Sequence, residues 1–279
     1  MDLKASVLIA VYNAVRELEL VLTGFARQSC REFEVVIADD GSRPEMRTFV
    51  ESFARGAPFP VRYVSQPDEG FRKCGILNEA VRASSAPYLI FIDADCIPHR
   101  DFVHAHLDHQ EDRTVLCGRR VNLSPQMSRS LTVQDVSDGA LDGWSLPLVL
   151  DGLLRRAGHL EEGLVIENRW LRSWLHRAEP VLFGCNYSLP RALLDEVNGF
   201  NEDFVDYWGE DLELGYRLRA AGAKLLWVRH RAIQYHLHHA QRARSEHSSR
   251  LLERARTECK AVCANGLRKL APQDMPYRN

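Results

Sequence analysis

The stretch Tyr88-Leu89-Ile90-Phe91-Ile92-Asp93-Ala94-Asp95 joins five consecutive apolar side chains to two closely spaced aspartates. An apolar run of this length, bounded by turn residues, is typical of a central strand in a parallel sheet. In open α/β sheets, the carboxyl end of such a strand faces the ligand crevice. Two carboxylates there repel each other, so they indicate a hard divalent cation that also binds substrate phosphates. The alternative is that one aspartate caps the turn and the other is solvated.

The segments before this stretch alternate between strand and helix patterns. We expect strands at residues 5–11, 33–38 and 61–65, separated by helices at residues 15–28, 45–55 and 73–84. This rhythm predicts a mainly parallel sheet with right-handed crossovers. Val11-Tyr12-Asn13-Ala14 follows the first strand in place of G-x-G-x-x-G, which argues against a dinucleotide site.

The second half of the chain has a different pattern. Residues 125–180 have a helical pattern with Gly and Pro breaks, and we interpret them as an insertion within a domain spanning residues 1–239. Strands are expected at residues 181–189, 224–228 and 232–235, and helices at 210–221 and 241–264. Residues 240–279 would form a basic C-terminal helix and tail.

Composition restricts the class of protein. The 279 residues are 45% hydrophobic and 27% charged, as in ordinary globular proteins. The seven cysteines include no Cys-x-x-Cys pair, so neither a disulfide framework nor a zinc knuckle is indicated. No apolar run approaches about 20 residues and no signal peptide is recognisable, so a cytoplasmic protein is expected.

Charge is unevenly distributed along the chain. Residues 229–279 contain eleven Lys and Arg against four acids, which gives +7 there and −9 elsewhere. A basic tail suggests an anionic partner, such as a membrane surface or a polyanionic acceptor, although a solvated basic helix has the same pattern. We expect no nucleic-acid partner.

Two further motifs lie at the carboxyl end of a predicted strand or at the start of a predicted helix. Asp39-Asp40-Gly41-Ser42 ends the second strand, where a carboxylate can accept the imide N–H of uracil or cap a helix. Gly70-Phe71-Arg72-Lys73 opens the next helix, and its N–H groups and cations suit phosphates or a solvated first turn. Together with Tyr12 and Asp95, Asp40 would line one rim.

Two motifs near the C-terminal side contain aromatic, acidic and imidazole groups. Asp206-Tyr207-Trp208-Gly209-Glu210-Asp211 sets an indole beside two carboxylates, which suits a sugar, although acids also favour helix N-termini. His236-Leu237-His238-His239 provides three imidazoles, which are either solvated or bound to a metal. Imidazole combined with carboxylate favours Mn²⁺ over Mg²⁺.

Taken in order, these motifs resemble the family 2 glycosyltransferases of GT-A fold. The resemblance rests on Val7-Leu8-Ile9-Ala10-Val11-Tyr12-Asn13, Asp39-Asp40-Gly41-Ser42 and Asp93-Ala94-Asp95. Phe183-Gly184-Cys185-Asn186, Asn198-Gly199-Phe200 and Trp208-Gly209-Glu210-Asp211 are similar to the C-terminal part of β4-galactosyltransferases and bacterial chondroitin polymerase modules. The resemblance extends over about residues 6–239, and it implies a Rossmann-like mixed sheet flanked by helices.

The resemblance also implies roles for individual residues. Asp40 would hold uracil and Asp93 the ribose, with Ala10, Tyr12 and Asp39 in the same nucleotide site. Asp95, His236 and His239 would bind Mn²⁺ (or Mg²⁺), while His238 departs from the family pattern. Arg72 and Lys73 would contact the diphosphate. Asp211 would be the catalytic base, Glu210 would hold the acceptor, and Trp208 would stack on a sugar.

The implied activity is inverting transfer from a UDP-sugar to an acceptor hydroxyl. The acceptor would be a glycan or lipid-linked glycan in bacterial surface polysaccharide or lipopolysaccharide synthesis. The alternatives are a non-catalytic sugar-nucleotide-binding subunit and a nucleotidyltransferase. Trp170 and Trp174 share one face of a basic helical segment. That face would either lie on the inner face of the membrane, as a peripheral contact, or pack on the catalytic domain.

Overall fold

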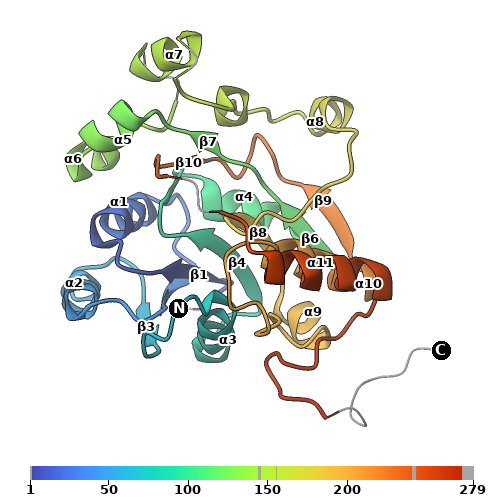
Figure 1. Cartoon of the computed structure of the whole chain (residues 1–279). Helices are drawn as coiled ribbons and strands as arrows, with labels where there is room; N and C mark the ends of the chain where they lie inside the picture. Colours follow the sequence, from blue (N-terminus) through green and yellow to red (C-terminus); the bar gives the residue numbers. More distant parts are fainter. Residues whose placement is uncertain (1, 144–145, 155, 241–242, 272–279) are drawn as a thin grey trace.

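A seven-stranded sheet forms the centre of the protein (Figure 1). The computed structural model describes residues 2–143, 146–154, 156–240 and 243–271. In spatial order the strands are β3 (Val61–Ser65), β2 (Phe33–Asp39), β1 (Ala5–Val11), β4 (Tyr88–Asp93), β8 (Asn186–Pro190), β6 (Thr114–Cys117) and β9 (Lys224–Trp227). Of these strands, β8 runs antiparallel to both neighbours and the other pairings are parallel. The predicted mainly parallel α/β sheet is therefore confirmed.

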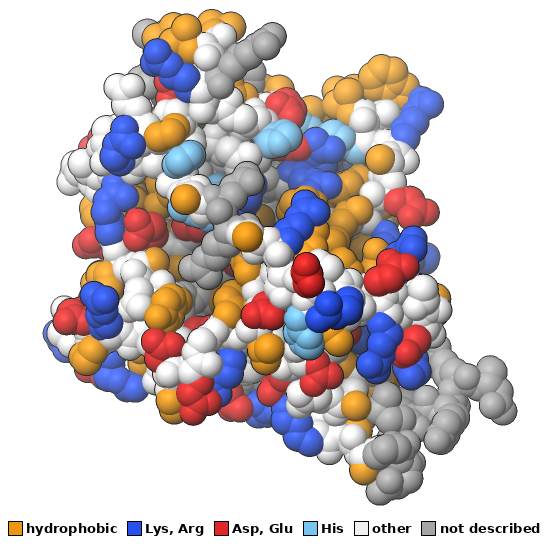
Figure 2. Space-filling model, viewed as in Figure 1, with side chains coloured by type: hydrophobic (Ala, Val, Ile, Leu, Met, Phe, Trp, Pro, Cys, Tyr) orange, Lys and Arg blue, Asp and Glu red, His pale blue; other side chains and the backbone are white. Residues whose placement is uncertain are grey.

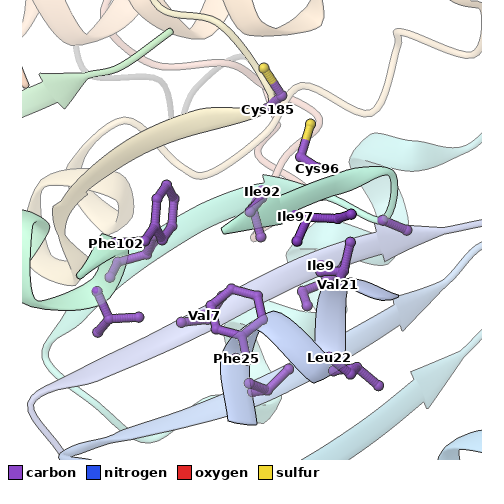
Figure 3. Close-up of a cluster of buried hydrophobic side chains, with 14 of the residues drawn as sticks. Val7, Ile9, Val21, Leu22, Phe25, Ile92, Cys96, Ile97, Phe102 and Cys185 are labelled. Carbon is purple, nitrogen blue, oxygen red and sulfur yellow. The ribbon is translucent and has the colours of Figure 1, made fainter. Parts of the chain in front are cut away.

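Helices cover both faces of this sheet. Those packed on one face are α1 (Val15–Ala26), α2 (Pro44–Ala54) and α4 (Phe102–Asp108), and those on the other are α3 (Lys73–Ala83), α9 (Arg191–Glu196) and α10 (Glu210–Ala220). Along β1, Val7 and Ile9 enter the first core and Leu8 the second. Burial on both faces explains why the central strands are apolar almost throughout. Figure 3 shows the first core, with Cys96 and Cys185 side by side at its edge.

A second sheet of three strands lies beyond the end of β4. Its order is β5 (Cys96–Pro98), β10 (Gln234–His236) and β7 (Val121–Asn122). In this sheet His236 is paired antiparallel with Cys96 and parallel with Asn122. Because β5 begins directly after Asp95, this pairing brings the histidine segment to the end of the central strand.

The insertion consists of short helices at the top of Figure 1. They are α5 (Pro125–Ser130), α6 (Val133–Ser137), α7 (Leu146–Leu153), the 3₁₀ turn η1 (Leu160–Gly163) and α8 (Arg169–Leu175). Arg16 of α1 anchors the insertion, because its guanidinium donates to the carbonyls of Ser128 at 2.9 Å and Leu131 at 3.0 Å. The domain boundaries drawn from the sequence stay a prediction.

The C-terminal helix is shorter than predicted. Helix α11 covers Glu246–Glu258, whereas the sequence pattern predicted residues 241–264, of which 241 and 242 lie outside the described residues. The Ser245 side chain caps its start, and Cys259 ends it with a left-handed backbone conformation at φ 49°. Asn198 holds the segment that follows, donating to the carbonyls of Cys263 and Arg268. These tertiary hydrogen bonds replace the last predicted helical turn. Within the described ranges, every helix is too short or too polar to cross a bilayer.

Candidate functional site

Asp95 and two histidines form the first group of side chains, here called the Asp95 cluster. Asp95 lies in the turn after β4, and His236 ends β10. Asp95 Oδ2 is 3.4 Å from His236 Nε2 and 3.2 Å from His239 Nε2. The two imidazole rings are 5.0 Å apart. His238 is exposed, and its backbone N–H donates to Ser128 Oγ at 2.8 Å.

The Asp95 cluster fits a divalent metal ion. Its ligand atoms are one carboxylate oxygen and two imidazole nitrogens that face one another, a combination that suits Mn²⁺. Ligand atoms of Asp95, Cys96 and His236 also lie within 4.8 Å of one another. The buried His236 Nε2 has no hydrogen-bond partner among the described residues, which leaves its lone pair available. Burial alone would raise the pKa of Asp95, but the neighbouring imidazoles of His236 and His239 lower it overall, so the carboxylate is ionised.

Asp211 belongs to a second group, here called the Asp211 cluster, which also contains Glu210, Lys73 and Asp93. Asp211 and Glu210 occupy the first turn of α10. Asp211 Oδ2 accepts the backbone N–H of Gly184 at 2.7 Å. A Cβ at Gly184 would lie 2.8 Å from that same oxygen, so a side chain at this position would displace Asp211. Gly184 therefore fixes how the carboxylate is oriented.

The electrostatics of this second cluster suit proton transfer. Burial and the neighbouring Glu210 carboxylate raise the pKa of Asp211 well above its usual range, while Lys73 and the Gly184 N–H oppose the rise. Burial alone would lower the pKa of Lys73, but Asp93 and Glu210 raise it well above its usual value. Lys73 is therefore a cation placed between two acids.

Residues adjacent in the chain bring the Asp211 cluster next to the Asp95 cluster, because Asp93 lies two residues before Asp95. Lys73 Nζ is 3.1 Å from Asp93 Oδ1 at the end of β4 and 3.4 Å from Glu210 Oε1 at the start of α10. On the other side, the thiol of Cys185 contacts that of Cys96, the residue after Asp95, and Gly184 holds Asp211. The acids and imidazoles that the sequence predicted to converge therefore lie in one region of the molecule.

The predicted nucleotide residues lie along the neighbouring strand ends. Asp40 is buried, and its carboxylate accepts the Gln66 side-chain amide and, at 2.9 Å, the Arg72 backbone N–H. Burial raises the pKa of Asp40, although these two hydrogen bonds oppose the rise. The exposed Tyr12 donates from its hydroxyl to Asp68 at 3.0 Å.

Three predicted site residues have contacts within the fold itself. Asp39 is buried, and its two oxygens accept the Tyr63 hydroxyl and the Ser42 N–H. The Arg72 guanidinium pairs with Glu69 at 2.9 Å in its own loop, and its buried Nε has no partner among the described residues. Ala10 is a half-buried strand residue that lies opposite Asp93 in β4.

Trp208 introduces α10 with an unusual backbone conformation. Its φ is 99°, which non-glycine residues rarely adopt, and Gly209 follows at φ 95°. The guanidinium of Arg244 lies 3.8 Å from the indole ring centre and so covers one face of Trp208. Strain of this kind is concentrated at functional sites, and here it precedes the two acids directly.

A cavity of about 470 Å³ is lined in part by arginines that the sequence patterns did not single out. The residues that line it include Arg119, Arg120, Asn122, Phe183, Cys185 and Arg229. The pair Arg119-Arg120 follows β6, a strand of four residues. Such a short strand has no distinctive periodicity in sequence, and the adjacent arginine pair was the one available signal.

Comparisons with known proteins agree with this geometry. Residues 6–134 match the family model described as glycosyl transferase family 2, and residues 175–240 match one described as the N-terminal domain of galactosyltransferase. Chondroitin synthase of Pasteurella multocida is 28% identical over 78% of this chain and 23% of its own length. Validoxylamine A glucosyltransferase of Streptomyces hygroscopicus is 32% identical over 78% of this chain and 51% of its own length. The chain thus spans between about a quarter and half of these two relatives.

Solved structures share the fold at low sequence identity. A mannosyltransferase from Pyrobaculum calidifontis, in complex with GDP-Man and Mn²⁺, has a TM-score of 0.58 and 15% identity and covers 92% of this chain and 69% of its own. GalNAc-T7 with UDP, GalNAc and Mn²⁺ has a TM-score of 0.63 and 13% identity, and the match covers 91% of this chain and 48% of the GalNAc-T7 chain. These proteins are GT-A glycosyltransferases. On its sequence matches and its sheet, this chain belongs to the family 2 glycosyltransferases of GT-A fold, with a galactosyltransferase-like C-terminal part.

Proposed function

We propose that this protein is an inverting glycosyltransferase that moves a sugar from a UDP-sugar to an acceptor hydroxyl and uses Mn²⁺ or Mg²⁺. The observation that carries the proposal is the proximity of the Asp95 cluster, which suits a metal, to the Asp211 cluster, which suits a base. Lys73 joins Glu210 to Asp93, which lies two residues before Asp95 in the chain. A nucleotide-binding module without chemistry has no need of a half-buried carboxylate with a raised pKa in the same region as its metal ligands.

Asp211 is the base in the proposed reaction. Inversion requires a group on the acceptor side that takes the hydroxyl proton as the oxygen attacks the anomeric carbon. The raised pKa of Asp211 brings its basicity closer to that task, and the Gly184 N–H keeps one carboxylate oxygen in place. Glu210 would hold the acceptor next to it.

The leaving diphosphate needs positive charge, and Lys73 is the cation best placed to provide it. Its ammonium lies between Asp93 and Glu210, whereas the Arg72 guanidinium is paired with Glu69. A divalent metal held by Asp95, His236 and His239 would stabilise the negative charge on the diphosphate as it departs. Asp40 and Tyr12 would bind the nucleoside, and Trp208 would stack on a sugar.

A panel of UDP-sugars tests the proposal. We expect slow hydrolysis of one donor, measured as released UDP, that requires Mn²⁺ and stops with EDTA. GDP-mannose is the matched control, because a solved structure with this fold carries that donor. Turnover of GDP-mannose alone would overturn the UDP assignment.

Two further measurements, of pyrophosphate release and of UDP-sugar binding, separate the two alternative functions. A nucleotidyltransferase would instead release pyrophosphate from UTP and a sugar phosphate. A non-catalytic subunit would bind UDP-sugars in calorimetry and turn over none of them, with or without oligosaccharide acceptors. Either result would contradict the proposed transfer reaction.

The insertion supports a further part of the proposal, contact with a membrane that carries a lipid-linked glycan acceptor for surface polysaccharide or lipopolysaccharide. Trp170 and Trp174 of α8 are 75% and 54% exposed, and Leu153 at the end of α7 is 76% exposed. The residue of α8 that packs on the protein is Arg172, which donates to the carbonyls of Ile166 and Glu167. Figure 2 shows hydrophobic side chains gathered over α7 and α8.

Vesicle binding tests this contact. We expect the protein to co-sediment with vesicles containing anionic lipids at low salt, since tryptophans and cations together favour the lipid interface. The double substitution Trp170→Ser and Trp174→Ser should reduce the bound fraction several-fold. Substitution of Val133, an exposed apolar residue of α6, by Ser is the control. Equal sedimentation of wild type and double variant would exclude α8 as the contact.

A further inference from the structure

The cavity beside the Asp95 and Asp211 clusters contains more positive charge than its own acids neutralise. Arg229 is paired, because its guanidinium binds the buried carboxylate of Glu162 through Nε at 2.9 Å and through Nη2. Glu161 is exposed and lies near His159. Arg119 and Arg120 also line the cavity, and within the described part of the chain no carboxylate lies within ion-pair distance of either one.

One of the two unpaired guanidiniums, that of Arg119, is held in position by aromatic rings. Arg119 lies 3.9 Å from the ring centre of Phe183 and 4.8 Å from that of Trp227, so aromatic faces fix it without neutralising it. Burial and the charge of Arg229 lower the pKa of Arg119, and the attraction of Glu162 opposes this shift only in part. Half-buried cations of this kind are costly unless an anion accompanies them.

The cavity adjoins the reacting groups. Cys185 lines it and contacts Cys96, the residue after Asp95, and the preceding Gly184 holds Asp211. Burial alone would lower the pKa of Arg120, but Cys185, Cys96, Asp93 and Asp95 raise it overall, so Arg120 lies within electrostatic reach of the metal-binding acid. Figure 2 shows Lys and Arg side chains together with histidines in the upper middle of the view, between α7 and α8.

We propose that this cavity binds an acidic substituent, a carboxylate or a phosphate ester, of the sugar substrate, and that the enzyme therefore selects an acidic glycan. The proposal rests on the proposed function. The volume is in the range of small-molecule sites, and forked guanidiniums suit both carboxylate and phosphate oxygens. This acidic group is distinct from the donor diphosphate, since Lys73 and the Asp95 cluster are placed to bind the diphosphate.

The acidic group has two possible sources, the donor sugar and the acceptor, and the experiment separates them. With UDP and Mn²⁺ present, calorimetry compares a disaccharide ending in glucuronate with one ending in glucose. A second arm compares UDP-glucuronate with UDP-glucose, and a third uses glucose 6-phosphate against glucose. We expect wild type to prefer the acidic member of at least one pair, and the arm that shows the preference identifies the source.

Arg119→Gln and Arg120→Gln should each reduce that preference by about 10- to 100-fold, the range for hydrogen bonds to charged groups. The affinity for UDP with Mn²⁺ should stay within about twofold. Arg119→Lys keeps the positive charge but lacks the forked guanidinium, so it should retain part of the preference for the acidic ligand. Arg55→Gln removes an exposed arginine at the end of α2 and is the matched control.

Three outcomes would overturn the proposal. They are no acidic preference in wild type, an unchanged preference in both glutamine variants, or a parallel loss of UDP affinity, which would assign the arginines to the diphosphate. Failure of wild type to bind UDP at all would instead contradict the proposed function, and an acidic preference measured without UDP would still support the cavity assignment.

Discussion

Asp211→Asn is expected to abolish glycosyl transfer while UDP binding in the presence of Mn²⁺ remains intact. The amide cannot take the acceptor proton, and loss of a general base typically costs about 10²- to 10⁴-fold in rate. Asparagine has the shape of aspartate, and its carbonyl oxygen can still accept the Gly184 N–H that now binds Asp211 at 2.7 Å. Single-turnover transfer and calorimetric UDP affinity, measured on the same preparation, separate chemistry from binding.

Asp112→Asn is the matched control for this prediction, because it makes the same chemical change at an exposed position before β6. The pH profile adds a second readout. Burial and Glu210 raise the pKa of Asp211, and a base acts only when deprotonated. The wild-type rate should therefore decline on acidification at a higher pH than for an ordinary carboxyl group. Turnover of Asp211→Asn near the wild-type rate would exclude Asp211 as the base.

Asp95→Ala is expected to remove the metal-dependent part of UDP binding. In the Asp95 cluster one carboxylate oxygen faces both imidazoles, so its removal leaves two neutral nitrogen ligands and no anionic one. Loss of a residue that merely supports a ligand costs about 10- to 100-fold in metal affinity, and loss of the ligand itself should cost at least that much. Calorimetry with UDP, with and without Mn²⁺, measures the difference directly.

Asp101→Ala is the control for the second prediction. Asp101 precedes α4, its side chain is about 43% exposed, and it makes no capping hydrogen bond to that helix. We expect it to leave Mn²⁺-dependent UDP affinity unchanged. If Asp95→Ala bound UDP as tightly as wild type at every Mn²⁺ concentration, Asp95 would be a turn residue without a metal role.

Local patterns in the sequence predicted the first half of the fold well. The strand from Ala5 to Val11 agrees with β1, and Tyr88-Leu89-Ile90-Phe91-Ile92 forms nearly all of β4. These segments are buried on both sides and carry continuous apolar runs, so burial and sequence pattern coincide. The predicted helix at residues 210–221 also agrees with α10, which ends one residue earlier, at Ala220.

Where tertiary contacts override the local pattern, the sequence was less informative. Helix α11 ends at Glu258 because Asn198 binds the segment after it, a partner that local propensity does not reveal. Asp39 and Asp40 are adjacent in one motif, yet their carboxylates accept hydrogen bonds from different donors. Tyr63 and Ser42 donate to Asp39, whereas Gln66 and Arg72 donate to Asp40. Which donors each of the two neighbouring carboxylates accepts from depends on segments that lie elsewhere in the chain.

The sequence by itself determined the layered α/β architecture and the kinds of side chain available for chemistry, because apolar periodicity and the positions of acids after strands are local properties. Tertiary structure alone decided which groups meet. Pairing of β10 with β5 sets His236 beside Asp95, and the backbone of Gly184 orients Asp211. The segment that follows the four-residue strand β6 brings Arg119 and Arg120 to the cavity that Cys185 also lines. Each of these contacts joins segments far apart in the chain, and such contacts arise from packing free energy rather than from the conformational preferences of neighbouring residues.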